Sequence, residues 1–408
     1  MDRHRVVVTG LGLVTPLGIG TGATWESLLR GTIAVREISR FDASTFPSRI
    51  AAQIDNFDPA DFLERRRIQW TDRFSQLGIA AARLAIDDAR FTLRGDEVGI
   101  YTGSALGGLA YAEDQIGLFH EKGIAAIRPL LTISVFGGAA GSNIALDFGF
   151  TGPSIANSNS CASGAIAIGE AFRAIARGDV RAAVAGGIEA PLAPLTFGAF
   201  TVVRAMSTRN GDPSAASRPF DAERDGFVMA EGAGMIVLER YEDAVARDAG
   251  AYCEITGYGV SNDAHHMSAP REDGAQTARA MQLALREARA EPESVDVINA
   301  HGSSTKLGDR AEALAYARVF GARIGQIPLS ATKGQHGHAL GATGAWEVAL
   351  CALSMKHGIV PATVNFRTRD PECNVGCSPD AVALEPSVIL SNSSGFGGIN
   401  AALVLQRG

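Results

Sequence analysis

Long apolar runs are missing from this chain of 408 residues. No stretch of about 18 residues stays apolar without turn signals, so we expect no membrane-spanning helix. The N-terminal run 5–12 is too short and too rich in glycine for a secretory signal peptide. Positive residues are also outnumbered, because 37 Lys and Arg stand against 44 Asp and Glu, which gives a net charge of −7 at pH 7. This balance argues against a protein that coats nucleic acid.

Cysteine is rare as well: the chain has Cys161, Cys253, Cys351, Cys373 and Cys377. Their odd number and scattered positions, with no secretory signal, predict reduced thiols in the cytoplasm. Glycine, by contrast, is abundant, and its 47 residues cluster in short loops. This pattern indicates many tight turns between strands and helices. With 46% hydrophobic and 20% charged residues, the composition is that of a globular protein with an ample core.

Strand patterns and helix patterns alternate along the chain. Apolar, β-branched runs that end in small-residue loops predict strands at 6–9, 98–102, 182–185, 295–299 and 388–391. Helical patterns occupy 73–89, 162–177, 275–290 and 345–357. At the start of the helix predicted from 275, Asp273 and Gln276 have the spacing of a capping box. Such alternation predicts a layered α/β architecture with mostly buried strands.

The chain also carries traces of a duplication. Segment 98–104 is similar to 295–303, and segment 182–187 is similar to 388–393. A repeat of about 200 residues predicts two similar halves, which we divide as 1–250 and 251–408. Because no linker stands out, we expect the halves to pack as one body.

One cysteine has surroundings that suggest chemistry. Cys161 lies in the uncharged run 155–169, where apolar residues recur at helical spacing up to Gly178, a helix stop signal. We therefore expect a buried helix whose first turn begins at this thiol. The free N–H groups and the dipole of the helix start would favour the reactive thiolate. The alternative is a cysteine buried merely as a small hydrophobic residue.

Three further loops follow predicted strands or precede a small-residue helix: 299–305, 330–338 and 391–400. Loops at strand ends are where α/β proteins keep their reactive groups. Taken alone, a histidine after a strand is more often structural than catalytic. His336 and His338 resemble a metal-binding pair, but no carboxylate or thiol accompanies them at ligand spacing. We expect no metal.

Together and in this order, the loops resemble those of the β-ketoacyl-acyl carrier protein synthases, thiolase-fold condensing enzymes, along essentially the whole chain. The resemblance rests on Cys161-Ala162-Ser163-Gly164, on 299–305, on Lys333 with His338, on 395–400, on 218–221 with 224–227, and on 231–234. It implies a thiolase-like α/β fold, with two similar halves in an α-β-α-β-α arrangement. The spacing is most similar to the elongating branch, which has a Cys-His-His triad.

The resemblance also implies catalytic roles. Cys161 would take an acyl group from a carrier-protein thioester, and the backbone N–H groups of Cys161 and Phe396 would form the oxyanion hole. Malonyl thioester would then lose CO₂, and the enolate would attack the acyl group. His301 and His338, as neutral imidazoles, would hydrogen-bond the developing enolate. Lys333 would orient and charge this region.

Glu312 has two interpretations. The resemblance makes it part of the support network of the catalytic residues. Its spacing from Asp309, however, is that of a capping box, which would make its role purely structural.

The resemblance also implies substrate-binding residues. Ser268, Ser303 and Thr305 would contact the phosphopantetheine arm of acyl carrier protein, which delivers the substrates, so no cofactor of the protein's own is expected. Leu106 would line the acyl pocket. Leu130 and Leu131 would lie near a dimer interface and help to cap that pocket, although core filling explains all three leucines equally well.

Because carrier proteins are acidic, the resemblance also suggests a docking role for basic residues of this acidic chain. Arg65, Arg66, Arg67 and Arg204 would form a basic patch at the mouth of the site that steers the carrier protein in. The resemblance further implies a dimer, either of two copies or with a related ketosynthase-like chain.

This sequence departs from the common pattern beside the reacting residues. Ser160 and Ala162 flank the cysteine, where the family usually has Ala and then Ser or Thr. Ser394 stands where elongating enzymes have Phe in the gating loop, and we place it among the substrate-binding residues. Gln335 and His336 replace the more usual Met-Thr. Both fatty-acid elongation and a specialised polyketide or polyene pathway therefore stay open.

Three other readings are less well supported. A silent partner subunit like a chain-length factor would typically lack the nucleophile, which is present here. A nucleotide-binding oxidoreductase needs a third glycine after 10–12, and none follows at the required spacing. A thiolase proper would carry a second catalytic cysteine in 391–400, where there is none.

Overall fold

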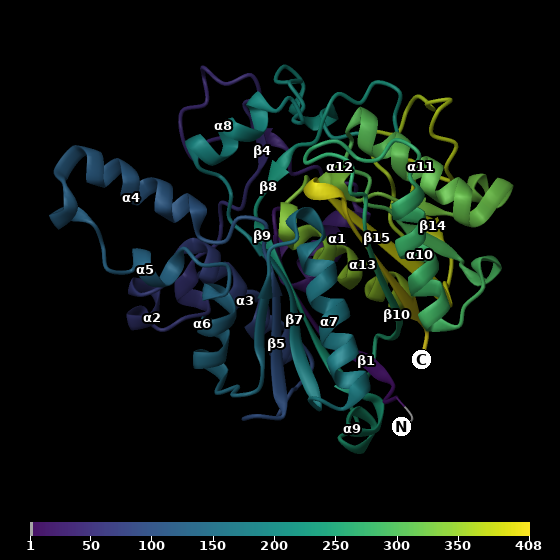
Figure 1. Ribbon diagram of the computed structural model, residues 1–408, viewed down its shortest axis with the longest axis horizontal. Coiled ribbons are helices and arrows are strands. Elements are labelled where there is room, and N and C mark those ends of the chain that lie inside the picture. Colours follow the sequence, from purple (N-terminus) through teal and green to yellow (C-terminus); the bar gives the residue numbers. More distant parts are fainter. Residues whose placement is uncertain (1–2) are drawn as a thin grey trace.

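One mixed sheet runs through the whole protein, which we describe for residues 3–408 of a computed structural model (Figure 1). Its order is β12-β11-β15-β16-β10-β1-β9-β7-β5-β6, with β2 beside β1. The strands are β1 (Val6–Thr15), β2 (Gly18–Ile19), β5 (Val98–Gly103), β6 (Ser154–Asn157), β7 (Ala182–Glu189), β9 (Gly232–Arg240), β10 (Cys253–Asn262), β11 (Val297–Asn299), β12 (Leu329–Ser330), β15 (Val388–Gly395) and β16 (Ile399–Gln406). Two small sheets join β3 (Arg36–Glu37), β4 (Ile50–Ala52) and β8 (Met229–Ala230), and β13 (Ile359–Val360) and β14 (Val382–Ala383).

The strand order is symmetric about its centre, where β1 pairs with β10. On one side follow β9, β7, β5 and β6, and on the other β16, β15, β11 and β12. The pairing directions match too: β7–β9 and β15–β16 are antiparallel, whereas β5–β7 and β11–β15 are parallel. The segments compared in the sequence, 98–104 with 295–303 and 182–187 with 388–393, occupy equivalent places. Two similar halves are therefore confirmed, and the division at residue 250 stays a prediction.

Helices form three layers around the two half-sheets (Figure 1). On the outer face of the first half lie α3 (Arg73–Asp88) and α6 (Ala139–Phe148). Between the half-sheets, α7 (Ser163–Arg177) packs against α13 (Thr343–His357). The outer face of the second half is covered by α10 (Ala275–Ala288), with α11 (Lys306–Phe320) packed on it. This is the expected α-β-α-β-α arrangement.

The central helices approach each other closely because small residues line their contact. A Cβ atom on Gly164 of α7 would lie 2.7 Å from the carbonyl oxygen of Gly341, just before α13. Nearly every side chain of α7 and of the segment 343–355 in α13 is buried. Both helices end at a glycine in the left-handed region, Gly178, which the sequence analysis predicts as a stop, and Gly358. The layer that carries the predicted nucleophile is thus the most enclosed part of the fold.

The predicted strands and helices are present, with boundaries that move by a few residues, but the capping box before α10 is wrong. Gly274, at φ +62°, is the N-cap residue of α10. Asp273 accepts a hydrogen bond from the Arg271 guanidinium at 2.8 Å and from the Ala275 backbone N–H at 3.1 Å. The carboxylate is therefore shared between Arg271 and the first helical N–H, and it comes from the residue before the N-cap rather than from the N-cap itself.

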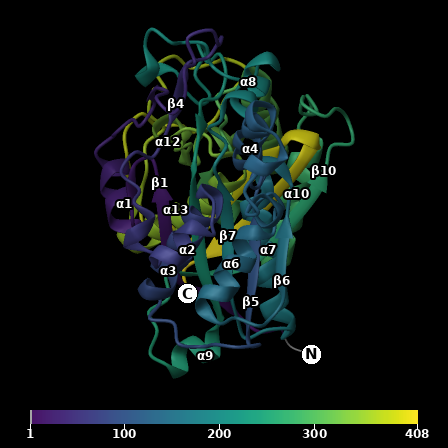
Figure 2. The same cartoon turned by 90° about the vertical axis from the view of Figure 1, so that its left-hand side faces the viewer.

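The remaining helices lie at the edges. They are α1 (Thr21–Leu29), α2 (Arg65–Gln69), α4 (Leu109–Lys122), α5 (Leu131–Ser134), α8 (Pro194–Val202), α9 (Tyr241–Ala246) and α12 (Lys333–His336). Helix α4 projects from the body on the side of α2, α5 and α6, the side that faces the viewer in Figure 2. Within 3–408, no helix has the length and apolar character needed to cross a membrane.

Candidate active site

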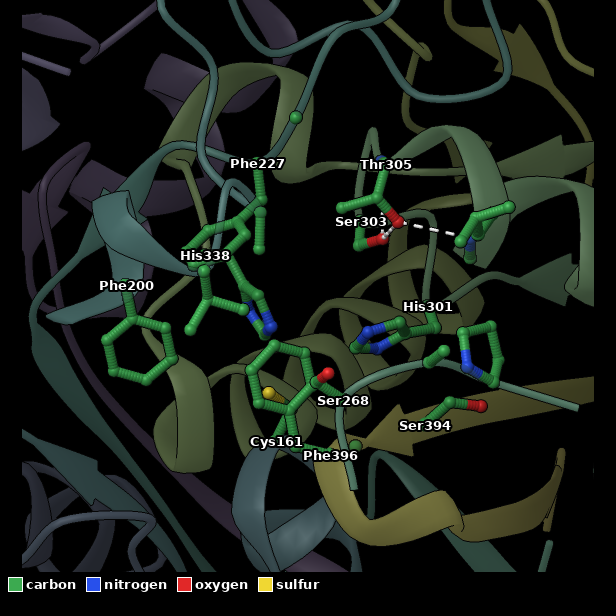
Figure 3. Close-up of a pocket in the computed structure, with 18 of the residues that line it drawn as sticks. Cys161, Phe200, Phe227, Ser268, His301, Ser303, Thr305, His338, Ser394 and Phe396 are labelled. Carbon is green, nitrogen blue, oxygen red and sulfur yellow. Dashed lines mark hydrogen bonds between the residues drawn. The ribbon is translucent and has the colours of Figure 1, made fainter. Parts of the chain in front are cut away.

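Four loops from both halves meet at one cavity of about 350 Å³. Cys161 lies in a 3-10 turn, Ser160–Ala162, between β6 and α7, and Phe396 follows β15. His301 follows β11, and His338 follows α12. All four residues line the cavity, and Figure 3 shows both imidazoles turned toward it above the sulfur. The structure thus brings together the nucleophile and both histidines that the sequence singled out.

The two histidines are held as neutral rings. Their ring centroids lie 5.2 Å apart, with the planes at 82°. Burial lowers the pKa of both His301 and His338 well below the ordinary 6.5, and the nearby charge of Lys333 lowers it further. Nδ1 of His338 lies 3.1 Å from Oγ1 of Thr343 at the start of α13. The expectation of neutral imidazoles agrees with this environment.

Lys333 lies beneath the cavity rather than in it. Its side chain is 1% exposed, and its Nζ donates to Oε1 of Glu347 at 2.5 Å and to the backbone oxygen of His301. Burial raises the pKa of Glu347 to about 7, against the opposing pull of Lys333. Glu347 was not predicted from the sequence, although it is the only charged residue in the buried segment 343–355. A lone carboxylate in such a helix is a signal for a buried partner.

Glu312 supports the His301 loop, and the capping-box interpretation is wrong. Thr305 is the N-cap of α11, with Oγ1 accepting from the Gly308 N–H at 3.1 Å, so Glu312 lies in the second turn. Its carboxylate accepts hydrogen bonds from the backbone N–H groups of His301 and Gly302 at 2.7 and 2.8 Å. The Tyr316 hydroxyl and the Asn392 amide also donate to it, at 2.6 and 2.8 Å.

Burial of Cys161 works against the thiolate that the start of the helix would favour. Burial raises the pKa of its thiol to about 11 and outweighs the opposing effects of the Ser160 hydroxyl, the Lys333 charge and the Phe396 N–H. The sulfur belongs to an apolar cluster that includes Phe227. The charged form of the sulfur, which the reaction requires, is therefore disfavoured by its surroundings.

Aromatic rings close the cavity around the thiol. The ring of Phe396 stacks on that of Phe200, with 6.0 Å between centroids, and in Figure 3 it stands in front of the sulfur. Phe227 meets the ring of His338 edge-on at 5.5 Å. These rings exclude water from the reacting atoms, which is the physical origin of the raised pKa of Cys161.

The predicted binding residues separate into two groups. Ser268, Ser303, Thr305 and Ser394 all line the cavity. The hydroxyls of Ser303 and Thr305 lie 2.9 Å apart, and the Ser394 hydroxyl donates to Oδ1 of Asn400 at 2.9 Å.

The three leucines lie outside this lining. Leu106 packs against the apolar cluster that contains Cys161. Leu130 is buried, and Leu131 begins α5, which contacts α4 and α6. One chain therefore brings Leu106, but not Leu131, near the nucleophile.

The four predicted docking arginines are not one patch within a chain. Arg204 lines the cavity. Arg65, Arg66 and Arg67 lie on α2, which is far below α8 in both Figure 1 and Figure 2, and none of the three lines the cavity. Arg67 is moreover engaged internally, with Nε 2.7 Å from Asp147 and Nη2 2.8 Å from Asn143.

A second buried carboxylate, Glu189, was also missed by the sequence reasoning. It is fully buried at the end of β7 and accepts hydrogen bonds from the backbone N–H groups of Ala105, Leu106 and Gly341 at 2.7, 3.1 and 2.9 Å. The Ser104 hydroxyl donates to it at 3.0 Å. Glu189 thus fastens the loop that carries Leu106 to the turn before α13. Its signal in the sequence is a carboxylate that closes the uncharged strand 182–188.

His336 does not form a metal pair with His338. Its Nδ1 donates to the Gly337 oxygen at 2.7 Å and its Nε2 accepts from the Thr332 hydroxyl at 2.8 Å, so both ring nitrogens are occupied. Over residues 3–408, no group of three or more His, Cys, Asp or Glu side chains is placed to hold a metal ion.

Comparison with known proteins agrees with this geometry. Residues 3–244 match the family "Beta-ketoacyl synthase, N-terminal domain" and residues 252–367 match "Beta-ketoacyl synthase, C-terminal domain". The chain is 39% identical to 3-oxoacyl-[acyl-carrier-protein] synthase 2 of Synechocystis sp. and 40% identical to that of Staphylococcus aureus (strain COL), in each case over 100% of this chain and 99% of the relative.

Solved structures share the fold over the full length of both chains. A ketosynthase/chain length factor of ishigamide superposes with a TM-score of 0.94 at 33% identity. A ketosynthase solved with its type II polyketide acyl-carrier protein, AntDE:AntF, superposes with a TM-score of 0.93 at 32% identity.

The fold and the site together define a thiolase-like condensing enzyme. The two family matches and the full-length relatives go one step further: this chain belongs to the β-ketoacyl synthase family. The expectations of the fold, the family and an acyltransferase of the condensing kind are thereby confirmed.

Proposed function

We propose that this protein condenses an acyl group carried on Cys161 with malonyl-acyl carrier protein and yields a β-ketoacyl-acyl carrier protein two carbons longer. The observation that carries the proposal is the convergence of Cys161, His301 and His338 on one enclosed cavity. The relatives named 3-oxoacyl-[acyl-carrier-protein] synthase 2 support it.

The first step is acyl transfer to the thiol. The Cys161 sulfur attacks the carbonyl carbon of the incoming thioester, and the new C–S bond replaces the bond to the carrier's phosphopantetheine sulfur, which leaves with the proton. The backbone N–H groups of Cys161 and Phe396 stabilise the oxyanion. Gly395 makes their approach feasible, because a Cβ atom there would lie 2.9 Å from the Cys161 nitrogen. The carrier thiol then departs.

The second step forms the carbon–carbon bond. Malonyl thioester loses CO₂, the electron pair moves into an enolate, and the enolate carbon attacks the acyl carbonyl and expels the Cys161 sulfur. His301 and His338 hydrogen-bond the enolate oxygen without giving up a proton, which suits rings held neutral. Nδ1 of His338 faces the Thr343 hydroxyl at 3.1 Å, and in the proposed tautomer it accepts from that hydroxyl while the N–H lies on Nε2. Lys333 and Glu312 position this pair from behind.

Substrates arrive on acyl carrier protein, so the chain needs no cofactor of its own. Ser268, Ser303 and Thr305 contact the phosphopantetheine arm along the cavity, as their place in its lining supports. Arg204 receives the carrier protein at the mouth of the cavity. Arg65 and Arg66 lie on α2, away from this mouth, and are not part of the docking site within one chain.

The protein works as a dimer with a second copy or a related chain. Support comes from β6, an edge strand whose Ile155 is 52% exposed, and from the exposed Leu146 and Ile133 on α6 and α5 of the same side (Figure 2). A dimer through this side would also give Leu131 its capping role. The free thiols of all five cysteines support a cytoplasmic location.

One experiment tests the proposed reaction. A panel of acyl-acyl carrier proteins is mixed with malonyl-acyl carrier protein and either the wild type or Cys161→Ala, and the products are followed by mass spectrometry. The wild type is expected to carry the acyl group on Cys161 and to release a chain two carbons longer, and the variant to do neither.

His301→Ala is the matched control, because it should still be acylated but release no elongated product. An absence of acyl adduct on wild-type Cys161 with every donor would refute the proposal. That outcome would favour a silent partner subunit of the chain-length-factor kind.

A further inference from the structure

The residue before the nucleophile has a side chain aimed at the reacting atom. Oγ of Ser160 donates to Sγ of Cys161 at 3.8 Å, within reach for a sulfur acceptor, and this is the bond that the half-buried hydroxyl makes. Family members usually have alanine at this place, as noted above. The hydroxyl is therefore a feature of this chain.

The backbone of Ser160 is held in a costly conformation that fixes this aim. Its φ of +53° lies in the left-handed region, which serine seldom adopts. Two contacts support it: the Ser163 hydroxyl donates to the Ser160 carbonyl at 2.7 Å, and Gly395 leaves room for the Ser160 Cβ, which would lie 3.1 Å from a Cβ there. Strain of this kind concentrates at functional sites.

The Cys161 sulfur has a clear need for such a donor. Burial raises the pKa of its thiol to about 11, and among the groups that oppose burial the Ser160 hydroxyl acts most strongly, ahead of the Lys333 charge. A hydroxyl that donates to an anionic acceptor stabilises the charged form.

We propose that Ser160 is a further catalytic residue of the condensation, whose hydroxyl donates a hydrogen bond to the Cys161 sulfur while that sulfur carries negative charge. The sulfur is anionic twice: when the thiol loses its proton to attack the carrier thioester, and when the finished chain leaves it. Ser160 keeps its own proton in both steps, so no bond to it forms or breaks. The inference rests on the proposed reaction for its role in turnover.

The test is the pH dependence of alkylation of Cys161 by iodoacetamide, read from the Cys161 peptide by mass spectrometry. Ser160→Ala and Ser160→Gly both remove the hydroxyl, and glycine also suits the left-handed backbone, so this variant keeps the test valid if alanine prevents folding. We expect both to be alkylated about ten-fold more slowly at pH 8, with the inflection about one pH unit higher.

Ser158→Ala is the matched control in the same loop. Its hydroxyl donates to the Ala105 carbonyl at 3.1 Å and does not contact the sulfur, so its alkylation profile should equal that of the wild type. An unchanged inflection in both Ser160 variants would overturn the proposal. A shift in Ser160→Ala without one in Ser160→Gly would also overturn it, because backbone strain and not the hydroxyl would then be the cause.

Alkylation requires no carrier protein, so this result is independent of whether the wild type elongates any chain. In turnover, Ser160→Ala should lower kcat/KM for acyl transfer about ten-fold at neutral pH while KM for malonyl-acyl carrier protein stays unchanged.

Discussion

The buried ion pair beneath the active site leads to a prediction whose size follows from the structure. Lys333 and Glu347 are 1% and 0% exposed and 2.5 Å apart. Glu347→Leu keeps a similar volume but leaves the Lys333 ammonium with only the backbone oxygen of His301 as a partner. Removing one member of a buried pair costs about 3–5 kcal/mol of unfolding free energy. For a chain of 408 residues that corresponds to a fall in Tm of about 3–6 °C.

The double variant Lys333→Met/Glu347→Leu separates pairing from burial. It removes both charges together, so neither ion has to be desolvated, and we expect it to recover most of the stability lost in Glu347→Leu. Urea unfolding of the wild type, the two single variants and the double variant completes a double-mutant cycle and measures the coupling. Both variants that lack Lys333 should be inactive in condensation, because the charge beside His301 is gone.

The surface pair of Arg407 and Glu385, 3.4 Å apart with Glu385 79% exposed, supplies the control. Glu385→Gln should change the unfolding free energy by less than about 1 kcal/mol. The reasoning is refuted if Glu347→Leu costs no more than this control. It is equally refuted if the double variant is less stable than Glu347→Leu, because Glu347 would then not be the counter-ion of Lys333.

Three further predictions concern single residues. Burial lowers the pKa of His336 to about 3. As pH falls below 6.5, His336 binds a proton in the unfolded chain but not in the folded one, so this residue costs about 1.4 kcal/mol of unfolding free energy per pH unit. Urea unfolding at pH 7 and pH 5 should therefore show a smaller loss of stability for His336→Thr than for the wild type, and equal losses would contradict the assignment. Thr343→Val should lower kcat/KM about ten-fold and leave the binding of carrier protein intact, because Nδ1 of His338 loses the partner that selects its tautomer; an unchanged rate would show that the ring needs no such partner. Glu189→Gln places an amide against backbone N–H donors, so we expect the unfolding free energy measured in urea to fall by about 2–4 kcal/mol. The loop of Leu106 should also loosen and admit a broader range of acyl chains, whereas unaltered stability would show that Glu189 does not hold that loop.

The sequence predicted the reacting residues because each follows a local signal. Cys161 heads a helix whose first half is uncharged, and His301 and His338 lie in loops at the ends of predicted elements. These signals are short-range, and their family-specific order made them informative together. Glu189 and Glu347 were missed because their roles depend on distant partners: Glu189 bonds to Ala105 and Gly341, which are 84 and 152 positions away in sequence.

The predictions that failed also failed for long-range reasons. The spacing of Asp273 and Asp309 suggested capping boxes, but Gly274 is the N-cap residue of the first helix and Thr305 that of the second. The helix start at Cys161 favours a thiolate, whereas aromatic rings from other segments bury the sulfur and raise the pKa of its thiol. Local patterns indicate which interactions a residue can make, and the tertiary environment determines which of them form.

The duplication explains why only one half carries a nucleophile. The turn before α7 and the turn before α13 are equivalent, and their sequences align as Cys161-Ala162-Ser163-Gly164-Ala165 and Gly341-Ala342-Thr343-Gly344-Ala345. Gly341 therefore occupies the place of Cys161 in the second half. A Cβ atom there would lie 2.6 Å from the Ala105 nitrogen and 2.8 Å from the Glu189 carboxylate, so no side chain fits. Glycine at one copy of the turn lets the two helix starts approach, and that approach holds the cysteine of the other copy between loops that come from both halves.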